Sequence, residues 1–180
     1  MPGDGSRITP PDGGSDETGA AAGIPGRRPL IVGYGNPLRS DDGLGPLAAA
    51  LLADDPRLRG ARVLQRHQLT PELAADVAEA SLVILIDVNI VDESGVVSVR
   101  RLDETAGSGS GSSHHAAPED LIALARALWD ASPAVFIVSV GAASLEVGED
   151  LSPPLLRALP AVVDAVATIV AEHGEPGSDG

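Results

Sequence analysis

The sequence contains no cysteine and no lysine, since all 12 of its basic Lys or Arg positions are arginine. Without cysteine there is no thiol nucleophile, no disulfide framework and no cysteinyl zinc site. Without lysine there is neither a Walker phosphate-binding lysine nor a Schiff-base lysine. We interpret the accompanying richness in Ala, Gly, Pro and Arg as a codon effect of a GC-rich genome.

Aromatic residues and positive charge are also scarce. One Phe, one Tyr and one Trp accompany a hydrophobic content of 43%, so the core of this 180-residue chain must be aliphatic. The formal net charge of −14 disfavours nucleic acids and anionic membranes as partners. No uninterrupted apolar run approaches the roughly 18 residues of a membrane span, and Arg27-Arg28 precedes too short an apolar run for an export signal, so we expect a soluble cytoplasmic protein.

The composition predicts one folded domain, residues 29–172, between two tails. Residues 1–28 form an acidic stretch rich in Gly and Pro with little to bury, and we expect them and residues 173–180 to be disordered. The Gly/Ser tract from Glu104 to Ser113 is expected to be a mobile loop.

Apolar runs alternate with helical patterns along the domain. This alternation predicts an α/β fold with a mostly parallel sheet and helices on both faces. The expected strands are Leu30 to Val32, Arg62 to Gln65, Leu82 to Ile86, Val96 to Val99 and Val135 to Val140. The expected helices begin after Asp42-Gly43, at Thr70-Pro71 with Thr70 as cap and Ala80 on its apolar face, at Pro118 (to Trp129) and near Pro154 (to Glu172, with Ser152 as cap).

Acidic side chains follow two of these strands. Asp41 and Asp42 come after the first, and Asp87 directly after the third. Ligands in open α/β sheets bind beyond the carboxyl ends of the strands, and two carboxylates held together there favour a bound cation. His114, from the Gly/Ser loop, could complete an Asp, Asp, His set that suits nickel, zinc or iron. From the residues alone, another explanation is equally open: the Asp residues could cap the helices that follow them, and the histidine could be a surface residue without a function.

Two other chemistries fit poorly. Gly33 and Gly35 begin a dinucleotide-binding pattern, but its third glycine position is Leu38 and two Asp residues follow where a pyrophosphate would bind. The stretch from Gly107 to Gly111 has Gly109 where a serine hydrolase would carry its nucleophile.

Four blocks of the sequence resemble those of the hydrogenase maturation proteases, the endopeptidases that trim [NiFe] hydrogenase large subunits. The blocks occur in the family's order and span most of residues 30–170. They read IVGYGNPLRSDDGLG (Ile31 to Gly45), HQLTPELAADVAEASLVILIDV (His67 to Val88), SSHHAAPEDLIALA (Ser112 to Ala125) and SVGAASLEVGEDLSP (Ser139 to Pro153).

The resemblance implies a three-layer α/β/α sandwich with a five-stranded sheet. It also implies a metal site of Asp42, Asp87 and His114, and a substrate that is the nickel-loaded large-subunit precursor, whose short C-terminal extension is removed. His115 is an alternative to His114, which we favour because it directly follows Ser112-Ser113. The residues expected to shape the first loop are Gly33, Gly35, Asn36, Asp41 and Gly43.

The sequence departs from the family where Val88 replaces the usual Ala and where Arg66 to Thr70 replaces a Gly-Thr-bearing recognition loop.

Two mechanisms fit the resemblance. Either the metal activates a water with Asp41 or Asp42 assisting proton transfer, or nickel already seated in the precursor serves as a recognition tag, which the family favours. The alternatives are a non-catalytic nickel-binding assembly factor and an unrelated metal-dependent amide hydrolase.

Overall fold

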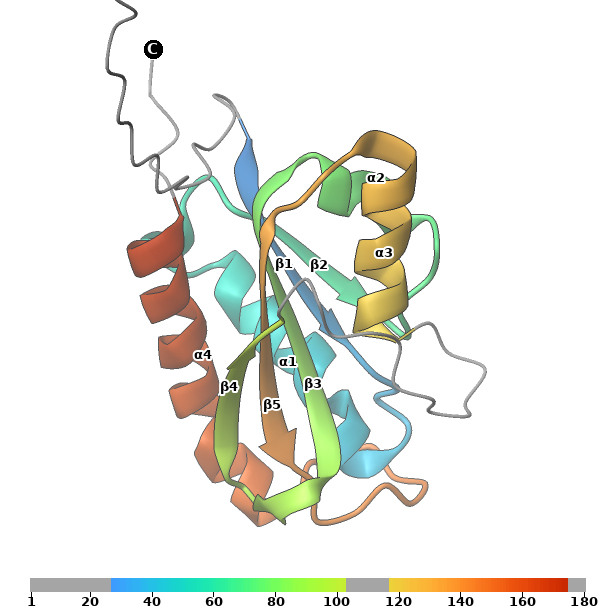
Figure 1. Ribbon diagram of the computed structural model, residues 1–180. Helices are drawn as coiled ribbons and strands as arrows, with labels where there is room; N and C mark the ends of the chain where they lie inside the picture. The colour runs from blue at the N-terminus through green and yellow to red at the C-terminus, as the bar shows by residue number, and fades with distance from the viewer. Residues whose placement is uncertain (1–26, 103–116, 175–180) are drawn as a thin grey trace, which may run out of the picture.

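The computed structural model describes residues 27–102 and 117–174. The strands and helices alternate through most of this part of the chain, as the hydrophobic pattern predicts (Figure 1). The strands are β1 (Arg28–Tyr34), β2 (Arg62–Arg66), β3 (Ala80–Ser94), β4 (Val97–Arg101) and β5 (Ala134–Gly141). The α-helices are α1 (Leu44–Ala53), α2 (Leu73–Ala78), α3 (Pro118–Trp129) and α4 (Pro153–His173), and the short 3-10 helices are η1 (Ser40–Gly43) and η2 (Pro56–Leu58).

The strands form one five-stranded sheet in the order β2-β1-β3-β5-β4. Strands β2, β1, β3 and β5 are parallel, and β4 pairs antiparallel with β5 at one edge. The carboxyl ends of the four parallel strands therefore meet at a single edge of the sheet. The predicted α/β architecture with a five-stranded, mostly parallel sheet is confirmed.

Helices cover both faces of the sheet, which gives three layers (Figure 1). Helices α1 and α4 pack on one face, and α2 and α3 pack on the other. Successive residues of β3 serve the two cores in turn, since Ile84 and Ile86 face α1 and α4 while Val83 and Leu85 face α2 and α3. Burial on both faces explains why this strand reads as a continuous aliphatic run.

Three element boundaries differ from the sequence predictions. Strand β3 begins at Ala80, which we had placed on a helix, and it continues to Ser94, well beyond Ile86. The second helix begins at Leu73, because Thr70 instead closes a turn in which its carbonyl oxygen accepts from the Leu73 N–H at 3.0 Å. The fourth strand runs from Val97 to Arg101 rather than from Val96 to Val99.

Helix α4 is long and apolar enough, by length and composition alone, to cross a membrane. It instead lies along the sheet with one face in the core, through residues that include Leu155, Val162 and Val166, and it carries Arg157 and Asp164. Such one-sided burial is typical of a helix that covers a sheet. Ser152 is its N-cap as predicted, although the side chain makes no capping bond.

The predicted tails and the Glu104 to Ser113 loop fall largely outside the described residues. Where the structure does describe their borders, β1 already begins at Arg28 and α4 extends to His173.

Candidate functional site

Two glycines bring β1 and the start of α1 into close contact. A Cβ atom on Gly33 would lie 1.9 Å from the carbonyl oxygen of Gly45, and one on Gly35 would lie 1.9 Å from that of Asp42. Gly35 also has a φ of +140°, a conformation that side chains rarely adopt. Both positions require glycine, and the close packing directs the following loop across the carboxyl edge of the sheet.

Asp42 is fixed within that loop by its neighbour Asn36. The backbone N–H of Asn36 donates to Asp42 Oδ2 at 2.9 Å, and the Asn36 side chain accepts from the N–H of Leu38 at 3.0 Å. Gly43 ends η1 with Pro37 packed above it, where an added Cβ would lie 3.1 Å from the Pro37 Cα. The half-buried carboxylate of Asp42 thus has a defined position and an open side.

Asp87 lies on β3 just past the point where β1 stops pairing with it. The last pair between the two strands is Gly33 with Ile86, whereas β3 continues against β5 with Asp87 opposite Ser139. The sequence predicts Asp87 at the end of its strand. In the structure Asp87 lies inside β3, although it is still at the carboxyl edge of β1.

The surroundings of Asp87 favour its neutral form. Desolvation by burial raises its pKa to about 6, and the nearby charge of Asp42 adds to the rise. Hydrogen bonds from Tyr34 and from the Val88 N–H, the latter at 2.7 Å, oppose that rise. Burial and the Asp87 carboxylate in turn raise the pKa of the Tyr34 hydroxyl. The two carboxylates therefore repel each other in a partly buried site, and a bound cation would relieve that repulsion.

Asp42 and Asp87 line one cleft of about 400 Å³ at the carboxyl edge of the sheet. Segments distant in the sequence form its walls: the end of β1, the loop that follows it, the residues after β2, and the loop after β5. The lining residues are Tyr34, Gly35, Asn36, Arg39, Asp42, His67, Gln68, Leu69, Asp87, Val88 and Leu145.

Asp41 is absent from this lining because it points into the protein. It is wholly buried, and its Oδ2 accepts from the Ala143 N–H at 2.7 Å, the Ser144 N–H at 2.9 Å and the Ser152 hydroxyl at 3.0 Å. Its Oδ1 accepts from the Ser152 N–H at 2.7 Å. Burial alone would raise its pKa, but these hydrogen bonds outweigh burial and hold the pKa below its usual range. Asp41 ties the loop after β5 to the loop after β1 and has no free oxygen for proton transfer.

The predicted histidine ligands His114 and His115 lie outside the described residues. Within residues 27–102 and 117–174, no three His, Asp or Glu side chains come together closely enough to hold a metal ion. The structure therefore brings Asp42 and Asp87 to one cleft and leaves the third ligand as a prediction.

Sequence reasoning gave no role to Tyr34, and it named His67 only as part of the segment Arg66 to Thr70 that replaces a recognition loop. Tyr34 is the single tyrosine of the chain and sits between Gly33 and Gly35 in the first block. His67 opens the second block and lines the cleft. A polar aromatic residue at the end of a buried strand was the signal for Tyr34, and the departure of the segment after β2 from the family pattern was the signal for His67.

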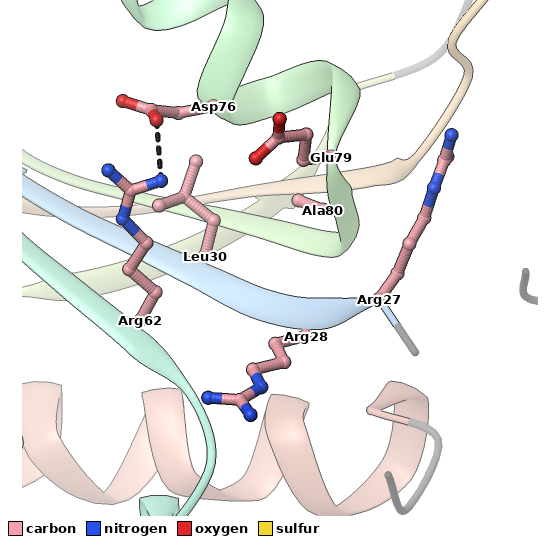
Figure 2. A pocket seen from close by; sticks show the side chains of 7 residues that line it. All are labelled: Arg27, Arg28, Leu30, Arg62, Asp76, Glu79 and Ala80. Atoms are coloured by element: carbon pink, nitrogen blue, oxygen red, sulfur yellow. Dashed lines mark hydrogen bonds and ion pairs between the residues drawn. The ribbon is translucent and has the colours of Figure 1, made fainter. Parts of the chain in front are cut away.

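A second cavity, of about 460 Å³, lies at the opposite edge, where β1, β2 and β3 begin. Arg27, Arg28 and Arg62 line it together with Asp76 and Glu79. Figure 2 shows the three guanidinium groups pointing in different directions, and Arg62 is held by Asp76 at 2.5 Å. No set of side chains converges there, so the cleft with Asp42 and Asp87 is the better candidate site.

No protein-family model and no curated protein sequence matches the chain. Several solved structures do match the chain. The hydrogenase maturating endopeptidase HybD from E. coli superposes with a TM-score of 0.68 at 22% identity, covering 82% of this chain and 94% of that one. The chain has the fold of the hydrogenase maturation endopeptidases.

Two archaeal structures agree. The hydrogenase 2 maturation peptidase from Thaumarchaeota archaeon SCGC_AB-539-E09 gives a TM-score of 0.61 at 23% identity, over 81% of this chain and 99% of that one. The [NiFe] hydrogenase maturation protease HycI from Thermococcus kodakarensis KOD1 gives 0.65 at 17% identity, over 80% and 92%. The likeness spans nearly the whole length of these proteins.

Proposed function

We propose that this chain is an endopeptidase that removes the C-terminal extension of a nickel-loaded [NiFe] hydrogenase large-subunit precursor in the cytoplasm. One observation carries the proposal: Asp42 and Asp87 line a single cleft at the carboxyl edge of the sheet, in a chain with the fold of the hydrogenase maturation endopeptidases. The first two of the four sequence blocks that resemble this family contain those same two residues.

The cleft suits a cation that arrives with the substrate. Carboxylate oxygens together with an imidazole bind nickel well, and we assign the imidazole to His114. Nickel bound there would polarise a nearby peptide carbonyl. Because these three side chains leave further coordination positions to be filled by the precursor, we expect the chain alone to hold free nickel weakly, and the nickel in the precursor would mark it as ready for cleavage.

The chain's own residues prepare the site in two ways. Asn36 holds Asp42 in place through its N–H, and Tyr34 holds Asp87 through its hydroxyl. With a pKa of about 6, Asp87 is mostly ionised at neutral pH and can act as a ligand, whereas mild acid protonates it. We therefore expect cleavage to decline as the pH falls through about 6.

Purified wild-type protein should be mixed with nickel-loaded precursor and, separately, with nickel-free precursor, and the product masses measured. We expect loss of a short C-terminal peptide from the loaded precursor only. Efficient cleavage of nickel-free precursor would contradict the role of nickel as a recognition tag. Stoichiometric nickel transfer without cleavage would instead identify an assembly factor, and hydrolysis of small amides in place of the precursor would identify an unrelated hydrolase.

A further inference from the structure

Four strongly exposed aliphatic side chains lie on the three segments that also supply residues of the cleft wall, and we call them the apolar rim. They are Val147 with 92% of its surface exposed, Val91 with 89%, Ile90 with 79% and Leu38 with 57%. Among the described residues, the three most exposed large hydrophobic side chains all belong to this group, and every other one is at most 62% exposed. Scattered exposed apolar residues are ordinary, but a concentration at one site marks a contact surface.

Hydrogen bonds between three segments bring the rim together. The N–H of Gly148 donates to the Leu38 carbonyl at 3.0 Å, and the N–H of Ser40 donates to the Gly148 carbonyl at 2.7 Å. These bonds set Val147 beside the first loop. The N–H of Ala142 donates to the Asn89 carbonyl at 2.7 Å, which holds the outer part of β3 against the start of the loop after β5, the loop that carries Val147.

The rim continues into the cleft wall. Ile90 follows Val88 by two residues and Val147 follows Leu145 by two, and both Val88 and Leu145 line the cleft. Strand β3 supports this arrangement because it extends past Asp87 instead of ending there, and Figure 1 shows that extension turning into β4 at the carboxyl edge of the sheet. Ile90 and Val147 are thus each two residues from the cleft wall.

Exposed carboxylates border the rim. Glu93 lies on the outer part of β3, and Glu146, Glu149 and Asp150 lie on the loop after β5. Apolar side chains on segments that also carry exposed negative charge favour a partner with apolar and basic side chains. Three of the four rim residues are β-branched Val or Ile, whose stiff side chains lose little freedom when a partner covers them.

We infer that the apolar rim is the docking surface for the protein substrate, and that it takes an aliphatic segment of the precursor flanked by Lys or Arg. This inference rests on the proposed function, since the precursor is the occupant. The rim supplies affinity and the cleft supplies the chemistry. Changes in the rim should therefore alter binding and leave the chemical step intact.

The test compares precursor binding and cleavage by wild type, by the double variant Ile90→Ser/Val147→Ser, and by a matched control, Leu51→Ser/Leu128→Ser. The control residues are 48% and 62% exposed and lie near the ends of α1 and α3, away from the carboxyl edge of the sheet. We expect the rim variant to bind nickel-loaded precursor roughly tenfold more weakly and to raise KM by a similar factor with kcat unchanged. The control should stay within about twofold of wild type.

Salt and charge provide a second readout. Raising the salt concentration should weaken wild-type binding, and Glu146→Gln/Glu149→Gln should reduce that dependence. Thermal unfolding midpoints of all variants should match wild type, which separates docking from folding.

The outcomes distinguish this inference from the proposed function. Equal binding by the rim and control variants overturns the docking surface, while cleavage by wild type would leave the protease assignment standing. Rim-dependent binding without cleavage supports the docking surface and contradicts the protease. Wild type that neither binds nor cleaves overturns both. Sedimentation velocity that shows wild type dimerising through the rim also overturns the inference, because a second copy would then be the occupant.

Discussion

Replacing Asp41 by asparagine removes the negative charge on which four hydrogen bonds converge. If the asparagine oxygen takes the place of Oδ2, it keeps three of these bonds, and the amide nitrogen then faces the N–H of Ser152. Hydrogen bonds to charged groups contribute about 1.5–3 kcal/mol each, and a buried donor without an acceptor costs about 1–3 kcal/mol. We therefore expect Asp41→Asn to lower the free energy of unfolding by about 2–4 kcal/mol, a large part of a typical domain's stability.

Urea unfolding at pH 7 measures this loss, and Asp42→Asn is the matched control. Asp42 accepts one backbone hydrogen bond, which an asparagine oxygen can keep, so its loss should stay below about 1 kcal/mol. Because folding lowers the pKa of Asp41, its contribution is present above the unfolded value of about 3.9 and is lost as the pH falls through the folded value. The difference between wild type and Asp41→Asn should accordingly shrink below about pH 4. Equal stability of the two proteins at pH 7 would refute the assignment of Asp41 to holding the two loops together.

Three further changes follow from the site. Folding raises the pKa of Asp87 to about 6, so its ionisation costs stability as the pH rises from about 4 to about 6, by up to roughly 3 kcal/mol. Asp87→Asn should therefore unfold at higher urea concentration than wild type at pH 7.5, equally at pH 4, and should not process precursor; a destabilised variant at pH 7.5 would contradict the pKa argument. Gly35→Ala places a Cβ 1.9 Å from a carbonyl oxygen of the following loop, so we expect a loss of several kcal/mol in urea unfolding, and wild-type stability would show that the loop can shift. In precursor cleavage assays, His114→Ala should be inactive while His115→Ala and His67→Ala keep at least a tenth of wild-type activity; loss of activity with His67→Ala alone would transfer the imidazole role to that residue.

The sequence predicted the sheet and its helices because each apolar run has a period that suits one element. Strand β3 was predicted too short. Its outer part contains Asn89, Asp92 and Glu93, and it pairs irregularly with β5, so no apolar alternation marks it. The extension depends on tertiary contacts, including the pairing of Ser94 with Gly141.

The two carboxylates of the cleft were predictable from the sequence, but the role of Asp41 was not. Strand ends pointed to Asp42 and Asp87, since parallel strands end at one edge of a sheet. The role of Asp41 was not predictable, because its partners Ala143 and Ser152 lie 102 and 111 residues away in the chain. Two adjacent Asp residues look alike in the sequence, and only the packing of the loop after β5 shows that one is buried and the other faces the cleft.

The central claim is that Asp42 belongs to a peptidase site, and mass spectrometry of a co-expressed [NiFe] hydrogenase large subunit tests it most directly. Cells supplied with nickel would express the subunit with wild-type protein, with Asp42→Asn, or with the control Asp164→Asn, which changes an exposed carboxylate on α4. We predict loss of a short C-terminal peptide with wild type and the control, and a full-length subunit with Asp42→Asn. Removal of the same peptide by Asp42→Asn, in cells that leave the subunit intact without this chain, would contradict the account.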